Sequence, residues 1–282
     1  MSILLTGLPR AGTTWASRAI AAATGSRVAH EPFNWRRRPD RLPYHMKYLP
    51  SGSNDPSLID ILERASRPRH TFPWSARPVV VKDVHICLAL EIIWEELHPR
   101  VIILVRHPCA LAHSWARLGY EVRFRLDLLL SQEKLMADHL NRFEAHLRQR
   151  GGFFFEVGAY WGAAYFVLAR QSARHSEWQW ATHESLCVDS FSRYQALLQR
   201  AGVELSRGGQ AALRRFLEGH NRRRRGQEGP YSVSRLSAAE PDKWLQRLDP
   251  DQIRAVLSGA APFGVLETWY DRPEDRSDGA FR

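Results

Sequence analysis

The sequence contains few cysteines, and they are scattered. Only Cys87, Cys109 and Cys187 occur in 282 residues, with no Cys-x-x-Cys pair and no cluster of histidines beside them. Disulfide-stapled domains and structural zinc sites need cysteines or histidines at close, paired spacings. The sequence therefore indicates neither a disulfide framework nor a metal site, and we interpret the three cysteines as reduced packing residues.

Long apolar runs are also absent. No stretch approaches the roughly 18 apolar residues of a membrane-spanning helix. No charged segment followed by an apolar one marks a signal peptide. The first apolar run begins next to Ser2, so cleavage of a leader would remove that run as well. We therefore predict a cytoplasmic protein without a membrane span.

Positive charge, by contrast, is abundant. The formal net charge is +10, which favours anionic ligands. Two arginine runs, at residues 36–38 and 222–225, lack a recognition helix or an RNA-binding aromatic strand. We interpret them as solvated faces or ligand contacts and expect no nucleic-acid partner. With 44% hydrophobic residues the chain can bury one large core, so we predict a single domain over residues 1–282, of unspecified oligomeric state.

A glycine-containing loop follows the first apolar run. Residues 3–5 are apolar, Gly7 and Gly12 bracket a turn, and Thr13 opens an alanine-rich segment. This order predicts a strand, a loop and the start of a helix. Backbone N–H groups at a helix start have no intrahelical acceptors and carry the positive end of the helix dipole. The loop therefore predicts a phosphate-binding site that Arg10 can close.

The loop lacks the lysine of a P-loop that binds nucleoside triphosphates. The spacing Gly7-x4-Gly12 matches a P-loop, but Thr13 stands where the lysine belongs, and the cation comes earlier, at Arg10. Phosphoryl-transfer enzymes use that lysine on the transferred phosphate and the next hydroxyl on magnesium. The sequence therefore favours a transferred group with less charge and no required metal.

With these residues the loop resembles that of the sulfotransferases that use 3′-phosphoadenosine-5′-phosphosulfate (PAPS). Their 5′-phosphosulfate loop reads P-[KR]-[SA]-G-T-T-[WL]. The resemblance implies that PAPS is the donor, that 3′-phosphoadenosine-5′-phosphate (PAP) is the product, and that no metal is needed. The residues that it implies for binding the donor are Arg10, Ala11, Gly12, Thr13, Thr14 and Trp15.

A second motif follows the expected fourth strand. Arg106 comes directly after the apolar run 101–105, Pro108 follows, and Ser114 lies one or two turns into the next helical segment. An arginine at a strand end and a serine on the following helix can converge on one anion. The motif resembles V-R-[DN]-P-x4-x-S of the same family, and this resemblance implies that Arg106 and Ser114 bind the 3′-phosphate of the nucleotide.

Apolar runs separated by helical segments predict the fold. Such runs are typical of parallel strands covered on both faces, and strands are expected at residues 2–5, 25–33, 78–82, 101–105 and 178–182. We predict an α/β, P-loop-like three-layer fold with a central parallel sheet of about five strands, helices on both faces and a helical cap. Further helices are expected at residues 58–65, 86–97, 126–150, 159–169, 190–201, 208–217 and 250–257. Insertions at about residues 34–76 and 119–152 are expected to form the acceptor side.

Sulfuryl transfer also needs charge stabilisation and a base for the acceptor proton. Lys82 ends the third expected strand, beside the first in the usual P-loop order, and can reach the bridging oxygen. Glu31 lies 21 residues after Arg10, and these residues with Lys82 resemble the arginine, glutamate and lysine of tyrosylprotein sulfotransferase. His85 resembles, more loosely, the histidine of the cytosolic small-molecule enzymes, which follows its lysine by two residues instead of three. Both are candidate bases, and we favour Glu31 because its spacing matches and a carboxylate beside Arg10 stays ionised.

The resemblance is weaker toward the C-terminus. His183 and Ser185 depart from the family's Y-E-D-L element after the fifth strand. Residues 231–234 and Lys243-Trp244 resemble its closing S-x-x-x-x-x-K-W segment.

Together these features predict a sulfotransferase that moves a sulfuryl group from PAPS to a hydroxyl of a small-molecule or glycan acceptor. A carbohydrate, a glycolipid and a natural product all fit. One alternative is a P-loop kinase of a small hydroxylated substrate, for which the sequence offers Thr13 but no lysine and no pair of strand-end acidic residues. The other is a non-catalytic basic protein that binds nucleotides or nucleic acid, which leaves Glu31 and Lys82 without a role.

Overall fold

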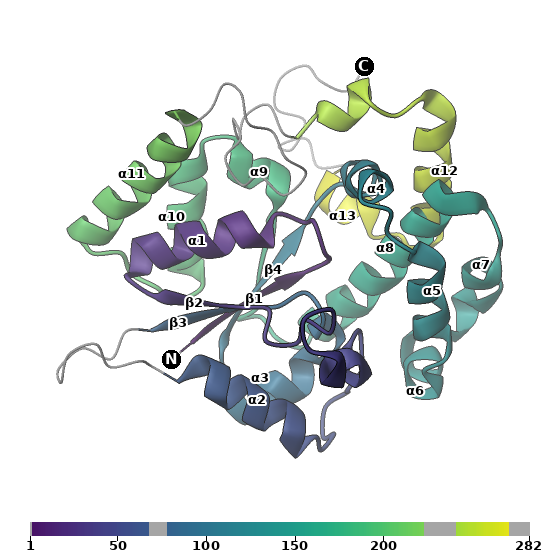
Figure 1. Ribbon diagram of the computed structural model, residues 1–282, viewed down its shortest axis with the longest axis horizontal. Helices are drawn as coiled ribbons and strands as arrows, with labels where there is room; N and C mark the ends of the chain where they lie inside the picture. The colour runs from purple at the N-terminus through teal and green to yellow at the C-terminus, as the bar shows by residue number, and fades with distance from the viewer. Residues whose placement is uncertain (1, 68–77, 223–240, 271–282) are drawn as a thin grey trace. The chain divides into compact units, whose positions relative to one another are not determined.

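The computed structural model describes residues 2–67, 78–222 and 241–270 (Figure 1). Contacts within the chain divide it into two compact units, Met1–Val105 with His175–Glu240 and Arg106–Arg174 with Pro241–Arg282. Most of the second arginine run, at residues 223–225, and the expected segment at 231–234 lie outside the described residues. The single-domain organisation stays a prediction.

The first unit is built on one parallel sheet, as predicted. Its strand order is β2-β3-β1-β4-β5, and every neighbouring pair is parallel. All five strands fall within the predicted apolar runs or extend them by one or two residues; they are β1 (Ile3–Gly7), β2 (Arg27–His30), β3 (Val79–Lys82), β4 (Arg100–Val105) and β5 (Gln179–Thr182). The predicted α/β fold with a central sheet of about five strands is therefore confirmed.

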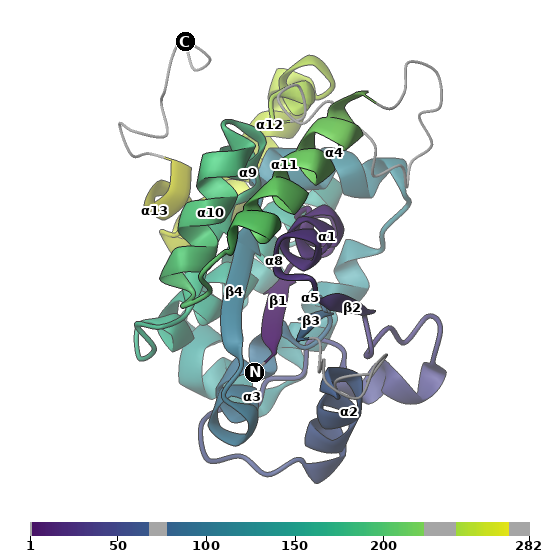
Figure 2. The same ribbon diagram turned by 90° about the vertical axis from the view of Figure 1, so that its left-hand side faces the viewer.

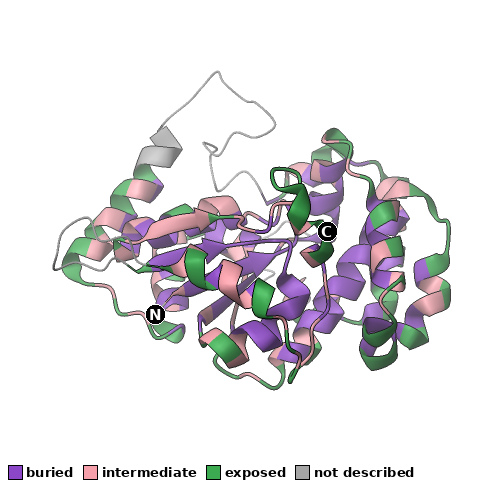
Figure 3. Cartoon of the chain, turned by 60° about the horizontal axis from the view of Figure 1, so that its bottom comes forward, coloured by how far each residue is buried: buried purple, intermediate pink, exposed green. Residues whose placement is uncertain are grey.

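Helices cover both faces of this sheet (Figures 1 and 2). On one side lie α1 (Thr13–Thr24), α10 (Ser190–Arg200) and α11 (Arg207–Arg222), and on the other lie α2 (Pro56–Ser66) and α3 (Leu90–Leu97). Leu5 and Ile102 of the sheet pack with Ile20, Leu197 and Leu213 of the first helical layer. Figure 3 shows buried residues along the strands and exposed residues on the outer faces of the helices. The apolar runs thus form strands because both of their faces are covered.

The register brings the carboxyl ends of the central strands to one edge. Leu5 of β1 is paired with Lys82 of β3, and Gly7 is paired with Leu104 of β4. The chain leaves β1 for the β2–β3 side and later crosses to the β4–β5 side, so β1 lies at a topological switch point. Ligands of open α/β sheets bind beyond the carboxyl ends of the strands at such a point.

The second unit is helical. It contains α4 (Pro108–Arg117), α5 (Val122–Leu130), α6 (Glu133–Leu135), α7 (Glu144–Arg148), α8 (Gly152–Ser172), α12 (Pro250–Ala260) and α13 (Leu266–Tyr270). Helices α8 and α12 cross at close range, because a methyl group on Gly158 or on Gly259 would clash with a backbone carbonyl of the facing helix. Helix α8 has the length and hydropathy of a membrane span, but 78% of its apolar window is buried inside the structure, as in a core helix.

The prediction of a single long helix at residues 126–150 is wrong. The chain ends α5 at Leu130 and continues through α6, a π-helical turn, a 3₁₀ turn and α7. Ser131 Oγ and Gln132 Nε2 both donate hydrogen bonds to the Leu128 carbonyl oxygen, at 3.0 and 3.1 Å. These side chains satisfy a carbonyl of the last turn and favour the end of α5 there, although the apolar period continues beyond it. The other predicted helices form with shifted ends, except that residues 87–89 of the expected 86–97 helix form a 3₁₀ turn before α3.

Candidate functional site

The loop between β1 and α1 has the backbone of an anion-binding turn. Gly12 is the N-cap of α1 with φ 92°, and its carbonyl accepts the N–H groups of Trp15 and Ala16, each at 3.1 Å. The N–H groups of the first two residues of the helix, Thr13 and Thr14, have no carbonyl one turn earlier in the helix to bind. The predicted order of a strand, a turn and a helix start is therefore present, with Thr13 and Thr14 in the first turn of α1, and phosphate binding by this loop stays a prediction.

Two predicted catalytic residues have strained backbones. Arg10 has φ 75° and Glu31 has φ 48°, in the left-handed region that non-glycine residues rarely adopt. The Glu31 N–H donates to the Lys82 carbonyl at 2.7 Å, and the Asn34 N–H donates to the Glu31 carbonyl at 3.1 Å. These bonds hold Glu31 in a conformation that costs about 1–3 kcal/mol, and such strain gathers at functional sites.

His183, which departs from the family's Y-E-D-L element, lies against the loop between β1 and α1. His183 begins α9 (His183–Cys187), directly after β5, and a methyl group on Gly12 would clash with its Nδ1. Its Nε2 lies 3.6 Å from the Cys187 sulfur. His183 therefore leaves no room for a side chain at position 12. The sequence signal for this placement is that His183 directly follows the fifth strand, because the ends of parallel strands lie at the same edge of the sheet as the loop.

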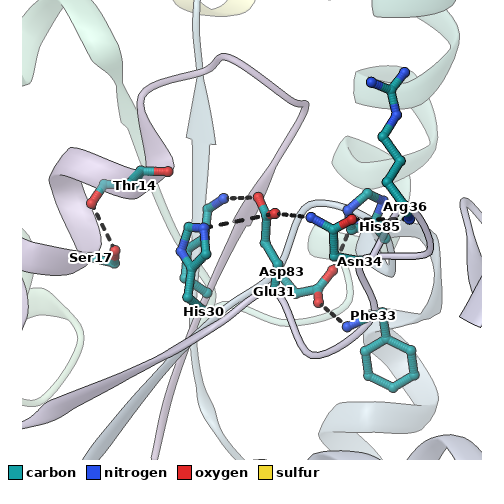
Figure 4. A network of polar contacts seen from close by, with 10 residues as sticks. Thr14, Ser17, His30, Glu31, Phe33, Asn34, Arg36, Asp83 and His85 are labelled. Carbon is teal, nitrogen blue, oxygen red and sulfur yellow. Dashed lines mark hydrogen bonds and ion pairs between the residues drawn. The ribbon is translucent and has the colours of Figure 1, made fainter. Parts of the chain in front are cut away.

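Lys82 and Glu31 form an ion pair at this edge (Figure 4). Lys82 is 2% exposed, and its Nζ donates to Glu31 Oε1. Asn34 Nδ2 donates to Glu31 Oε2 at 2.7 Å, and His30 Nε2 lies 3.8 Å from the same oxygen. Burial raises the pKa of the Glu31 carboxyl, but the charge and hydrogen bond of Lys82 outweigh burial and hold this pKa well below its ordinary value. Glu31 is therefore ionised.

Asp83 joins the turns that carry the candidate bases. Its two carboxylate oxygens accept the N–H groups of Phe33, at 2.8 Å, and of His85, at 2.7 Å. The carboxyl is fully buried, and burial raises its pKa to about 7 against the lowering effect of the two N–H donors. Asp83 thus ties the segment after β2 to the segment after β3 (Figure 4).

His85 pairs with a histidine from the segment expected to form part of the acceptor side. His85 Nδ1 lies 3.0 Å from His45 Nδ1, and both side chains are buried. No motif in the sequence marks His45 as a site residue. The residue stands in a segment without strand or helix periodicity, so no sequence signal could place it against His85.

Arg106 and Ser114 both belong to the second unit. Arg106 comes directly after β4, and its carbonyl accepts the indole N–H of Trp161 at 2.9 Å. Ser114 is half-buried on α4. The first unit therefore brings Glu31, Lys82 and His85 to the sheet edge of the phosphate loop, while a shared site with Arg106 and Ser114 stays a prediction.

Comparison with solved structures gives separate evidence on the fold. The chain is similar to mouse sulfotransferase SULT7A1 complexed with PAP, with a TM-score of 0.51 and 13% identity over 95% of this chain and 88% of that one. The chain has a sulfotransferase fold. It is also similar to a sulfotransferase domain from the curacin biosynthetic pathway, with a TM-score of 0.47 and 13% identity over 92% and 97% of the two chains. No protein-family model matches the sequence, and no curated protein matches it.

His107, a residue of the second motif, caps helix α4. His107 stands where the motif has Asp or Asn, and its Nδ1 accepts the N–H of Cys109, at 3.3 Å, as the N-cap of α4. Burial and then the charge of Arg106 lower the pKa of His107 to about 3, so the ring stays neutral and can accept this bond. The ring stacks on Trp244 with centroids 4.5 Å apart. His107 therefore caps α4 and contacts both segments of the second unit, 106–174 and 241–282.

Proposed function

We propose that this protein is a PAPS-dependent sulfotransferase that transfers a sulfuryl group to a hydroxyl of a small-molecule or glycan acceptor. The observation that carries the proposal is the ion pair between the buried Lys82 and the half-buried Glu31, at the sheet edge where the glycine-containing loop without lysine ends. A buried ammonium group such as that of Lys82 is costly to keep unless it binds a carboxylate or an anionic ligand. Charge stabilisation and proton acceptance are the two tasks that sulfuryl transfer requires.

The residues present fit the donor nucleotide. Main-chain N–H groups at the start of α1, the Thr13 and Thr14 hydroxyls and the Arg10 guanidinium would hold the 5′-phosphosulfate. Arg106 and Ser114 would hold the 3′-phosphate. When bound, PAPS supplies the sulfuryl group and a phosphate leaving group. The protein itself has to bind PAPS, orient the acceptor hydroxyl and remove its proton.

Glu31 is the proposed general base, and Lys82 controls its basicity. While Lys82 is bound to it, the carboxylate is a weak proton acceptor, because its pKa is held far below the working pH. Any anion that draws on the Lys82 charge weakens the ion pair and raises the basicity of Glu31. Asn34, bonded to the other carboxylate oxygen, keeps the group oriented meanwhile.

Turnover in the presence of a chelator tests the proposal. Incubation with PAPS, EDTA and a panel of hydroxylated acceptors should release PAP and add a sulfuryl group to one acceptor, as measured by mass spectrometry. Lys82→Met should abolish the reaction, while Arg254→Met, which removes an exposed arginine paired with Asp251 on α12, should not. A reaction that instead needs ATP and magnesium would favour the kinase, and binding of oligonucleotides without turnover would favour the non-catalytic protein.

A further inference from the structure

The side-chain amide of Asn34 contacts a partner at each of its polar atoms (Figure 4). Its Nδ2 donates to Glu31 Oε2 at 2.7 Å, and its Oδ1 accepts the main-chain N–H of Arg36 at 3.1 Å. The amide thus joins the proposed base to the turn that begins the first arginine run, residues 36–38.

These partners leave one orientation for the amide. A main-chain N–H can only donate, so the atom that faces Arg36 must be the amide oxygen. The amide nitrogen then faces Glu31, whose carboxylate oxygen accepts its hydrogen. The exchanged orientation would place two donors face to face at Arg36 and two acceptors face to face at Glu31. The direction of the bond between Asn34 and Glu31 therefore follows from the kinds of atom in contact.

The main chain of Asn34 is held as well. Its N–H donates to the Glu31 carbonyl at 3.1 Å, and its carbonyl accepts the N–H groups of Arg37 and Arg38 at 3.0 and 2.9 Å. A side chain that starts from a fixed main chain and is bonded at both polar atoms keeps a defined direction. Asn34 is therefore a rigid support for the Glu31 carboxylate.

A second donor to Glu31 matters because Lys82 has two partners in the proposed reaction. Lys82 binds Glu31 Oε1 in the structure, and it would bind the donor anion during transfer. When its charge is drawn to that anion, the Asn34 bond still restrains Oε2. Resting on the proposed function, we propose that Asn34 is a positioning residue that keeps the Glu31 carboxylate directed at the acceptor hydroxyl through its amide nitrogen.

Two substitutions separate this task from support of the turn. Asn34→Asp keeps an oxygen that accepts the Arg36 N–H, but it places a second carboxylate against Glu31. Asn34→Ala removes both side-chain bonds. If Asn34 only supported the turn, Asn34→Asp would behave like the unaltered protein. The positioning role requires that Asn34→Asp fails.

Gln199→Glu is the matched control, because it makes the same exchange of an amide for a carboxylate at an exposed residue of α10. The next residue, Arg200, donates from Nε to Gln179 Oε1 at 3.3 Å. Gln179 is the first residue of β5, so Gln199 lies at the edge of the sheet opposite to Glu31.

Carbon NMR of the glutamate side chains tests the bond without any activity. With ¹³C-labelled glutamate, and with Glu31 assigned from Glu31→Gln, Asn34→Asp should raise the titration midpoint of Glu31 by about one pH unit or more, because adjacent carboxylates share a proton. Asn34→Ala should raise it by less, since it only removes a hydrogen bond to the charged form. An unchanged midpoint in Asn34→Asp would overturn the proposal. The other titratable groups around Glu31 are the same in all variants; they are His30, Lys82, Asp83 and His85.

Steady-state kinetics, with the acceptor that the turnover test identifies, test the consequence for catalysis. Asn34→Ala should lower kcat by about 10-fold, as expected for one hydrogen bond to a charged group, and Asn34→Asp should lower it at least as much. The acceptor KM should hardly change, and in Asn34→Asp the acid limb of kcat/KM should move to higher pH. Normal kcat in Asn34→Asp, or an equal loss in Gln199→Glu, would contradict the positioning role. If the unaltered protein transfers no sulfuryl group, the proposed function is refuted, and the NMR titration still decides the bond between Asn34 and Glu31.

Discussion

The Glu31 carboxylate, to which the proposal assigns the chemistry, has contacts with Lys82, Asn34 and His30. Lys82 lies in an ion pair with one oxygen, Asn34 donates to the other, and His30 lies 3.8 Å away. The pKa of His30 is lowered, first by burial and then by Lys82, so His30 adds little positive charge near neutral pH. Lys82 is therefore the main electrostatic partner of the proposed base.

Substitution of the two candidate bases should separate their roles. Glu31→Gln keeps the shape of the side chain and removes proton acceptance, so we expect kcat to fall by about 10²–10⁴-fold with PAP affinity nearly unchanged. His85→Asn should mainly raise the acceptor KM. Because the pKa of Glu31 is lowered, kcat/KM should show no acid limb near the pH where histidines titrate. Glu177→Gln, at an exposed glutamate whose Oε1 lies 3.4 Å from His175 Nδ1, is the matched control, and an inactive His85→Asn with an active Glu31→Gln would reverse the assignment.

Asp83 predicts a pH dependence of stability. Its pKa is raised from 3.8 to about 7 in the folded protein, so between these values the folded state holds a proton that the unfolded state has released. Stability contributed by this group is present at low pH and is lost as pH rises through about 7. Asp83→Asn removes the titration and keeps one acceptor oxygen. The melting temperature of Asp83→Asn minus that of the unaltered protein should therefore increase from pH 4 to pH 8.

Asp60→Asn serves as the control for this measurement. Asp60 is an exposed carboxylate bonded to Arg64 at 2.8 Å, and its substitution should give a nearly constant difference over the same pH range. If the melting-temperature difference between Asp83→Asn and the unaltered protein stays constant from pH 4 to pH 8, the buried carboxyl does not titrate in this range.

At the scale of the element, the two ends of α1 allow a matched comparison. Gly12 at the N-cap has φ 92° and faces His183, whereas Gly25 at the C-cap has φ 66°, and a methyl group on it would meet no described residue within 4 Å beyond its chain neighbours. Alanine at either position should cost about 1–2 kcal/mol for the left-handed backbone, seen as a lower free energy of unfolding. Only Gly12→Ala should also weaken PAP binding, because it displaces His183 and the loop. Equal losses of affinity in both variants would mean that the loop is not the nucleotide site.

Elements could be predicted from the sequence where local pattern decides them. The strand Val79–Lys82 followed from a buried β-branched run, and Lys82 was placed at its end for the same reason. The break after Leu130 could not be predicted, because it depends on side-chain bonds of Ser131 and Gln132 and not on the apolar period. His45 meets His85 across 40 residues, a contact that only the folded chain brings about.

At the scale of the whole molecule, nucleotide binding tests the role proposed for Arg106. Arg106→Ala should weaken PAP binding by about 2–3 kcal/mol, the loss expected for a charge-assisted contact. Binding of adenosine-5′-phosphosulfate, which lacks the 3′-phosphate, should hardly change in isothermal titration. Arg117→Ala, an exposed arginine on the same helix α4, is the control. Equal losses for both nucleotides would remove Arg106 from the 3′-phosphate site.

The most direct test of the central claim compares three ligands by thermal unfolding of the unaltered protein: PAP, ATP with magnesium, and an oligonucleotide. A ligand at about 100 times its Kd stabilises the folded state by about 2.7 kcal/mol, which raises the melting temperature measurably. The account predicts a clear rise with PAP in the presence of EDTA and little or no rise with the other two. A rise with ATP and magnesium or with the oligonucleotide, and none with PAP, would contradict it.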